Sequence, residues 1–400
     1  MEEVEQCYMK RMGLVMGYNK GVESREDLLK YTPKLEDLPP RSMQDSFTAA
    51  LIPLSANPRL QYRYVSHNGG LRMGRLIEDM DFFAVWVCLQ HLHLPALPEN
   101  VAVPYTFVTI MADKILIIEQ KGDVTKDIRL SGHVSWVGRS SLEIVIWVEQ
   151  MENNKIKPIT RALFLMAARD AINSAAVPVN PISPATDEEK IILSGGEERK
   201  KKRLEVQSLS LFKVVPTAAE QMMIFEIHKR TKSKESIMLN TRKLPENGRW
   251  MSDWITISTI APFPQNLNNH NTVFGGFLMR QMIQTAFTCA NFYFADLPTM
   301  VCICDVNFAQ PVPVQSFIKF TSYILYTERE YALLLTIADV LCAVKGIQIT
   351  SNTLYIIFKA SKPVHEIFPR TYDESLWYIQ GTRIYRSAMD YIKSKNIRKS

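Results

Sequence analysis

The sequence predicts an α+β fold built from two similar halves. Each half contains one long, largely apolar helix, which begins near Gly74 in the first half and near Gly276 in the second. Each helix follows a strand-like run and a polar loop, and it precedes runs of β-branched and aromatic residues broken by turns. A long helix with four or five antiparallel strands, occurring twice, is typical of sheets that each wrap their own helix.

The predicted elements follow the same order in both halves. In the first half they are a strand at 46–52, a helix from 74, a strand at 107–113, a hairpin at 133–147 and a closing strand at 162–168. In the second they are a strand at 254–260, a helix from 276, a strand at 301–305, a hairpin at 321–337 and a closing strand at 353–358. A shift of 202 positions aligns three apolar helix positions: Leu76 with Leu278, Ile77 with Met279 and Met80 with Met282. This similarity indicates a divergent duplication.

Length and composition are those of a globular protein. Its 400 residues correspond to two or three domains of about 150 residues each, and 46% hydrophobic with 22% charged residues argue against disorder. The net charge of +6 neither requires nor excludes a polyanionic partner, and six cysteines without a CxxC motif favour a reducing compartment. No apolar stretch reaches the roughly 18 residues of a membrane span. The acidic N-terminus, MEEVE, predicts that a targeting segment is absent or atypical.

We expect five segments along the chain. They are an N-terminal extension (1–40), a first domain (41–179), a connector (180–240), a second domain (241–370) and a C-terminal tail (371–400). The connector carries a basic run from Arg199 to Arg203, which we expect to form a solvated helix face, because no aromatic residues are interleaved with it as in a nucleic-acid patch. Asp113 and Asp305 occupy matching places in the two halves, and we expect them to satisfy backbone turns.

Three carboxylates lie on the first predicted helix, where a helix wrapped by a sheet should carry almost none. Asp79 has an ordinary ion-pair partner in Arg75, four residues earlier. Asp81 has no basic residue three or four positions away, and it faces a mostly apolar stripe. A buried carboxylate without compensation costs several kcal/mol. Asp81 is therefore either a functional acid or base or a residue at a solvated or capped helix end.

The second half lacks this acid, because the position that matches Asp81 is Ile283. It has instead an asparagine-rich loop that includes Asn268 and Asn271 and ends in two glycines, the second of which is Gly276. Glycines at the start of a helix leave free backbone N–H groups at the positive end of its dipole, which suits an anion or oxyanion. The alternative is a common asparagine-rich N-cap and turn. The combination of an acid in one half with a glycine–asparagine loop in the other is stronger evidence for a site than the loop alone.

Several stretches of this sequence are shared with one family of enzymes. They are LPPRSMQDSF at 38–47, GRLIEDMD at 74–81, SGHVSWVG at 131–138, ARD at 168–170, NTVFGGFLMR at 271–280 and FPRTYDES at 368–375. In these stretches and in its layout the chain resembles the double hotdog-fold acyl-CoA thioesterases, in particular the mitochondrial acyl-coenzyme A thioesterase 9 subfamily. The resemblance implies tandem hotdog domains, each with a central helix wrapped by about five strands, and hydrolysis of acyl-CoA to free acid and coenzyme A.

The resemblance also implies roles for individual residues. Asp81 would act as general base for water or would attack the thioester itself, and the sequence leaves both open. The Gly276 N–H would stabilise the oxyanion, and either Asn271 or Asn268 would hold the water or the carbonyl. The converse pairing has no carboxylate, because Ile283 and Gln284 stand there. We therefore expect one working site per chain, between the two halves.

Two other functions are compatible with such a fold. An enoyl-CoA hydratase would need a histidine about five residues after the acid, but Trp86 stands at that place. A non-catalytic binder of acyl-CoA or nucleotide is the other alternative, and thiol release would separate it from an enzyme.

The expected ligand is acyl-CoA, with coenzyme A as part of the substrate and no separate cofactor or metal. Arg139 is a candidate contact for coenzyme A, although a role in shaping its hairpin is the stronger expectation. We expect a homo-oligomer without nucleic-acid partners or a membrane span. The resemblance implies a mitochondrial location, with a cytoplasmic one as the alternative.

Overall fold

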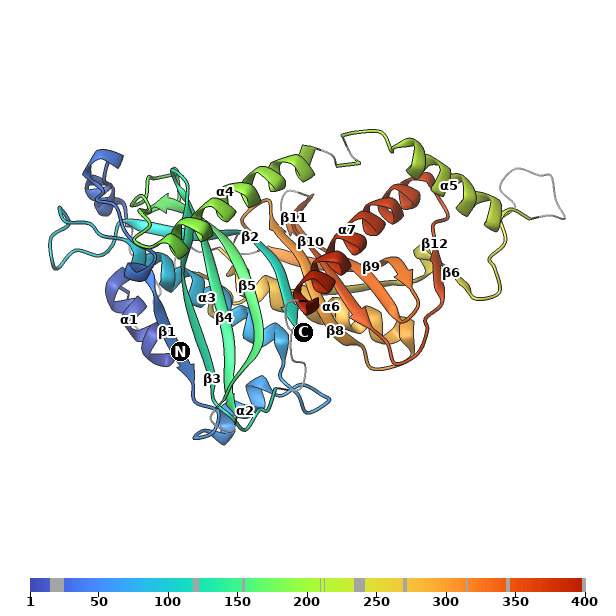
Figure 1. The fold of residues 1–400 in the computed structure, drawn as a ribbon, viewed down its shortest axis with the longest axis horizontal. Helices are drawn as coiled ribbons and strands as arrows, with labels where there is room; N and C mark the ends of the chain where they lie inside the picture. Colours follow the sequence, from blue (N-terminus) through green and yellow to red (C-terminus); the bar gives the residue numbers. More distant parts are fainter. Residues whose placement is uncertain are drawn as a thin grey trace.

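The computed structural model describes most of the chain (Figure 1). The described residues are 1–14, 25–117, 122–152, 155–208, 210–211, 213–233, 242–268, 272–313, 316–342 and 346–397. No helix within these ranges combines the length and the apolar composition that crossing a membrane requires.

The two halves form two domains of the same construction. The first contains α3 (Met73–His91) and five strands: β1 (Thr48–Ile52), β2 (Tyr105–Ile117), β3 (Ile128–Val137), β4 (Ser141–Glu152) and β5 (Lys155–Asp170). The second contains α6 (Gly275–Phe294) and five strands: β7 (Ile255–Ile260), β8 (Thr299–Phe308), β9 (Phe317–Glu328), β10 (Tyr331–Cys342) and β11 (Ile347–Lys359). All the strands and both central helices expected from the sequence are present, and the tandem hotdog prediction is confirmed.

Further elements lie outside this repeated unit. The helices are α1 (Glu2–Met12), α2 (Pro58–Tyr64), α4 (Asp187–Ser208), α5 (Ala218–Thr231) and α7 (Tyr372–Ile397). Two short strands, β6 (Gly248–Trp250) and β12 (Glu366–Phe368), form a separate parallel pair. Short 3-10 helices occur at Glu26–Tyr31, Leu35–Asp37, Gln44–Ser46, Met251–Asp253 and Pro264–Asn266. Helices α4 and α7 run across one side of the strands, as Figure 1 shows.

The ten long strands form a single sheet in the order β1-β3-β4-β5-β2-β8-β11-β10-β9-β7. Its middle is the antiparallel pair of β2 and β8, in which Met111 lies opposite Asn307 and Leu116 opposite Cys302. The sequence predicted one sheet for each half but not this junction, because local pattern carries no information on which edges meet. The junction brings the central helices α3 and α6 into contact with each other.

The pair of aspartates at this junction corrects one sequence expectation. Asp113 and Asp305 lie directly opposite each other on β2 and β8 and do not occupy turns. Burial, and then the charge of Asp113, raise the pKa of Asp305 to about 7. Both residues sit inside strands because the strands are longer than the apolar runs that predicted them.

Both central helices are enclosed by the sheet and by each other. Leu76, Ile77 and Met80 of α3 have no exposed surface, and Met279 and Met282 of α6 have none either. Residues of both helices belong to one continuous core. The apolar faces that predicted two long helices are therefore buried against the strands of their own domains and against each other.

The connector helix α4 is anchored to the first domain rather than solvated as expected. The Glu143 carboxylate, fully buried on β4, accepts hydrogen bonds from Arg199 at 2.6 Å and from Arg203 at 3.1 Å. Glu197 accepts a hydrogen bond from the Trp136 indole at 2.5 Å. Although burial alone would raise the pKa of Glu143, the two guanidinium groups outweigh it and lower that pKa. Arg199 and Arg203 therefore neutralise a buried acid, which sequence spacing cannot reveal, whereas the three lysines between them are exposed as the sequence predicted.

Removing both guanidinium groups tests this anchor. In Arg199→Met with Arg203→Met, the buried Glu143 keeps, among the residues that the structure describes, only the Ser135 hydroxyl as a side-chain donor. We expect about 3–5 kcal/mol of destabilisation, because an unpaired buried charge stays behind. Urea unfolding followed by tryptophan fluorescence measures it. The double variant of Lys201 and Lys202 to Met is the matched control, and an equal loss in both proteins would contradict the anchor.

Candidate active site

Asp81 lies in the third turn of α3 and is 1% exposed. The Thr109 hydroxyl, on strand β2, donates a hydrogen bond of 2.6 Å to its Oδ1 atom. The other oxygen, Oδ2, is buried and has no hydrogen-bond partner of ordinary geometry within the described structure. The helix-end alternative for Asp81 is therefore excluded, and its carboxylate keeps one oxygen available for another group.

The environment of Asp81 raises its pKa to about 7. Burial is the main cause, because the charged form loses its hydration, and the nearby charge of Glu78 acts in the same direction. The Thr109 hydroxyl and the backbone N–H of Gly276 partly oppose these effects by stabilising the charged form. A carboxylate with a pKa near neutrality is suited to accept and return a proton.

The N-terminus of α6, from the second domain, faces this carboxylate. A methyl group on Gly275 would lie 3.2 Å from the Asp81 Oδ2 atom. A methyl group on Gly276 would lie 2.9 Å from the Glu78 carbonyl oxygen and 2.7 Å from the Phe274 ring, which leaves no room for a side chain. The structure thus brings together Asp81 and Gly276, which lie in different domains.

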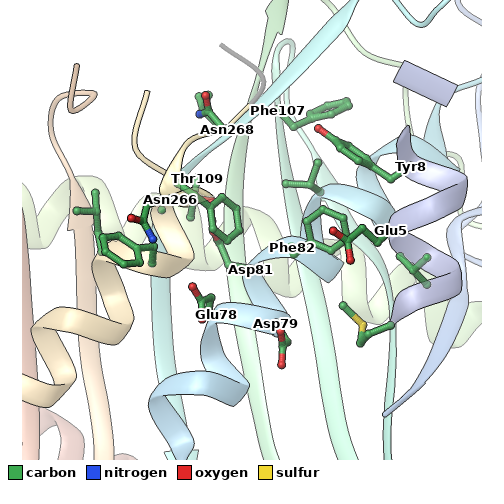
Figure 2. A pocket seen from close by; sticks show the side chains of 18 of the residues that line it. Glu5, Tyr8, Glu78, Asp79, Asp81, Phe82, Phe107, Thr109, Asn266 and Asn268 are labelled. Carbon is green, nitrogen blue, oxygen red and sulfur yellow. The ribbon is translucent and has the colours of Figure 1, made fainter. Parts of the chain in front are cut away.

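The structure describes part of the loop that precedes α6, up to residue 268 and again from residue 272. Asn268 exchanges hydrogen bonds with Thr272: its side-chain amide donates to the Thr272 hydroxyl at 2.7 Å, and its Oδ1 atom accepts from the Thr272 N–H at 3.2 Å. Asn271 lies outside the described residues. Asn266 also lines the site, and its carbonyl accepts from the Phe274 N–H at 2.9 Å. The two hydrogen bonds between Asn268 and Thr272 stabilise the conformation of this loop. Figure 2 shows Asn266 and Asn268 on the side of Asp81 that faces α6.

An ion-pair cluster holds the two central helices in register next to the site. Arg75 pairs with Asp79 at 2.8 Å, as the sequence predicted, and also with Glu78 at 2.7 Å. Glu78 in turn pairs with Arg280 of α6 at 2.8 Å. Glu78 and Arg280 are separated by the same 202 positions that relate the two halves, so they are equivalent positions of the duplication. This pair fixes α3 against α6 one turn before Asp81.

A cavity of about 1330 Å³ contains Asp81. It extends along α3, past Phe82 and Val85, to helix α1, and in the other direction to the loop before α6. Arg169 of β5 also lines it, and its guanidinium donates to the carbonyls of Asn173 at 3.2 Å and of Ser174 at 3.0 Å.

The structure adds residues that sequence reasoning missed and places one predicted residue elsewhere. No local pattern marked Thr109 as a site residue. Arg169 could have been identified, because it belongs to the ARD stretch at 168–170 on which the family resemblance partly rests. Arg139 is exposed in the turn between β3 and β4 and does not line the cavity. Ile283, which corresponds to Asp81, is 3% exposed on α6 and brings no acid to the converse position.

Comparison with known proteins shows to which family the chain is similar. Acyl-coenzyme A thioesterase 9, mitochondrial, of Mus musculus is 34% identical over 370 residues, which are 92% of this chain and 84% of that protein. The chain belongs to the acyl-coenzyme A thioesterase family. The thioesterase of the same description from Homo sapiens is 33% identical over 369 residues, again 92% of this chain. The resemblance seen in the sequence is confirmed, although no family model matches the chain.

Solved structures of similar proteins are more distant. An acyl-ACP thioesterase from Bacteroides thetaiotaomicron has a TM-score of 0.46 and 13% identity, over 80% of this thioesterase and all of that chain. An acyl-CoA hydrolase from Bacillus cereus has a TM-score of 0.36 and 22% identity, over 38% of this chain and 97% of the other.

Proposed function

We propose that this acyl-CoA thioesterase hydrolyses its substrate at one composite site, formed by Asp81 of the first domain and the N-terminus of α6 in the second. The observation that carries the proposal is a buried carboxylate with a pKa near 7, one oxygen of which faces Gly275 and Gly276. A base at neutral pH and backbone donors at a helix N-terminus are the two groups that thioester hydrolysis needs.

The proposed reaction runs through a tetrahedral intermediate. Asp81 takes a proton from a water molecule, and the oxygen of that water attacks the carbonyl carbon of the thioester. The carbonyl oxygen becomes an oxyanion, which the Gly276 N–H stabilises at the positive end of α6. When the carbon–sulfur bond breaks, the leaving sulfur takes the proton from Asp81. The products are the free acid and coenzyme A, and the carboxylate is restored.

Direct attack by Asp81 on the thioester is the alternative chemistry. It would release coenzyme A first and leave a mixed anhydride on Asp81. Water would then cleave the anhydride by attack on the Asp81 carboxyl carbon, which leaves the oxygen of that water on Asp81, or by attack on the acyl carbon, which leaves it on the released acid. A single turnover in heavy-oxygen water tests this alternative, because the general-base route puts the label into the released acid alone. Label in the peptide that contains Asp81, detected by mass spectrometry, would contradict the general-base route.

The loop asparagines remain candidates for holding the water or the carbonyl. Asn268 lines the cavity, and its bonds to Thr272 give its side-chain amide a fixed orientation. For Asn271 the prediction rests on the resemblance alone. Individual Asn268→Ala and Asn271→Ala variants, compared by kcat, assign the role to the one whose loss is larger.

The pH dependence of the reaction should report the Asp81 pKa. Because the base must be ionised, we expect kcat/KM to fall as the pH drops below about 7. Thr109→Val removes a hydrogen bond that stabilises the Asp81 carboxylate. The fall of kcat/KM at low pH should therefore move to higher pH by about one unit. Thr109→Ser keeps the hydroxyl and is the control. Profiles from thiol-release rates measure the shift, and coincident profiles for Val and Ser would contradict it.

The thiol-release assay also tests the activity and the number of sites. We expect purified protein to release coenzyme A from acyl-CoA, with one equivalent of a tight-binding thioester analogue titrating each chain. Two equivalents would contradict the single-site proposal, and no release from any acyl-CoA would support the binder alternative.

The assembly and location of the chain are further parts of the proposal. We expect a homo-oligomer, to be measured by light scattering, and a mitochondrial location, because the relatives in mouse and human are mitochondrial by description. Organelle fractionation tests the location, with a cytoplasmic signal as the contrary outcome.

Coenzyme A is expected as part of the substrate and not as a separate cofactor. Arg139 stays a candidate contact for coenzyme A, and Arg169 is better placed for that contact because it lines the cavity.

A further inference from the structure

Helix α1 forms one wall of the cavity that contains Asp81. The residues of the N-terminal segment that line it are Met1, Glu2, Glu3, Val4, Glu5, Tyr8, Met9 and Met12. The sequence expected only an extension outside the domains here. Figure 2 shows Glu5 and Tyr8 on the side of Asp81 away from α6, together with Phe82. The segment is therefore positioned to contact whatever occupies this end of the cavity.

This wall is held in place by packing and by backbone hydrogen bonds. The Tyr8 ring makes an edge-on contact with the Phe82 ring, at 5.2 Å between centroids and 73° between planes. Val4 and Met12 are 8% and 3% exposed and belong to the protein core. The Arg11 carbonyl accepts a hydrogen bond of 3.2 Å from the Val103 N–H. Helix α1 is thus built into the first domain.

The side chains at this end suit a hydrocarbon chain. Helix α3 contributes Phe82, Val85 and Leu89, and α1 faces them with Tyr8 and other apolar side chains. Phe82 and Asp81 line the same cavity, so an acyl chain attached to a carbonyl at Asp81 can extend along this apolar face. Each methylene group that enters apolar space strengthens binding about fourfold.

The two ends of the cavity differ in their lining. Three carboxylates, from Glu2, Glu3 and Glu5, line the α1 end, and cations lie beside them, because Arg129 is opposite Leu51, whose carbonyl accepts from the Met1 ammonium group. The opposite end has the N-terminus of α6, which attracts anions. The apolar lining therefore favours the acyl chain at the α1 end, and the helix N-terminus favours the phosphates of coenzyme A at the loop end.

From these observations we propose that α1 is the end wall of the acyl-chain tunnel and that Tyr8 limits the length of the chain accepted. This inference rests on the proposed function, because it takes Asp81 as the point where the thioester carbonyl lies. It assigns the selection of the substrate to the N-terminal helix and the hydrolysis to the interface of the two domains.

The test compares kcat/KM along a ladder of straight-chain acyl-CoAs, from butyryl-CoA to stearoyl-CoA. Tyr8→Ala removes the ring from the wall, so chains two carbons beyond the wild-type optimum should gain about tenfold relative to that optimum. Met9→Trp adds volume to the same wall and should shorten the accepted chain. Tyr8→Phe keeps the ring, and Cys7→Ala alters an exposed residue of α1 that does not line the cavity; both should keep the wild-type profile.

Two results would overturn the end-wall assignment. One is an unchanged length profile in both Tyr8→Ala and Met9→Trp. The other is an equal loss of kcat/KM for every chain length together with weaker inhibition by free coenzyme A, which would place coenzyme A at α1. Failure of the proposed function looks different, because the wild-type protein would then release no thiol from any member of the ladder.

Discussion

Asp81→Asn is expected to lower kcat for acyl-CoA hydrolysis by about a thousandfold, within the range of about 10²–10⁴ that general bases contribute. The amide has nearly the shape of the carboxylate and can still accept the Thr109 hydrogen bond at Oδ1. It cannot take a proton from water, so the loss should appear in kcat and leave KM nearly unchanged. Steady-state thiol release measures both constants.

The stability of the same variant supplies the control. Burial raises the folded pKa of Asp81 to about 7 from its ordinary value of 3.8, so its contribution to stability is full below pH 3.8 and is lost as the pH rises through 7. An uncharged asparagine avoids that loss. Asp81→Asn should therefore melt at the wild-type temperature or above it at pH 8. Intact thioesterase activity in a folded Asp81→Asn protein would refute the assignment.

Gly276→Ala is expected to reduce kcat/KM by about 10²-fold or more, the effect of losing one oxyanion donor. Its methyl group would lie 2.9 Å from the Glu78 carbonyl oxygen and 3.0 Å from the Glu78 Cα atom. Because both contacts are to the backbone of α3, the helices must separate, and the Gly276 N–H then moves away from Asp81. We also expect about 1–3 kcal/mol of destabilisation from overpacking.

The duplication offers a matched control for this variant. Gly74 is the equivalent position on α3, where a methyl group would lie 3.5 Å from the Arg280 Cγ atom, an ordinary contact. Gly74→Ala should therefore keep most of the activity and stability. Kinetics and thermal melting of both variants, measured together, make the comparison. Similar losses in the two proteins would indicate a general effect of separating the helices rather than a specific role for the Gly276 N–H.

Much of the fold and part of the site followed from local sequence pattern. The spacing of apolar residues predicted α3 and α6, and the runs of β-branched residues predicted the strands of both domains. Asp81 was recognisable because no basic residue lies within one helical turn of it. Gly276 was recognisable because it opens the second helix after a polar loop. The resemblance to thioesterases linked these two residues, and the structure places them face to face.

Other site residues could not be found in this way, because their partners lie far away along the chain. Thr109 approaches Asp81 from a strand 28 positions later. Glu78 meets Arg280 only because α3 packs against α6. Arg199 was expected to be part of a solvated basic run, but its partner is the buried carboxylate of Glu143, which lies 56 positions earlier in the sequence. Charge spacing along a helix detects partners within one turn and none beyond it.

The sequence by itself determined the type and order of the elements, the duplication and the separation of acid and glycine between the halves. These properties depend on side-chain periodicity and on backbone preferences, which act over a few residues. The tertiary structure decided how β2 and β8 join the sheets, how α1 closes the cavity and why the pKa of Asp81 lies near 7. Those outcomes depend on burial and on donors brought together from distant segments, so they exist only in the folded chain.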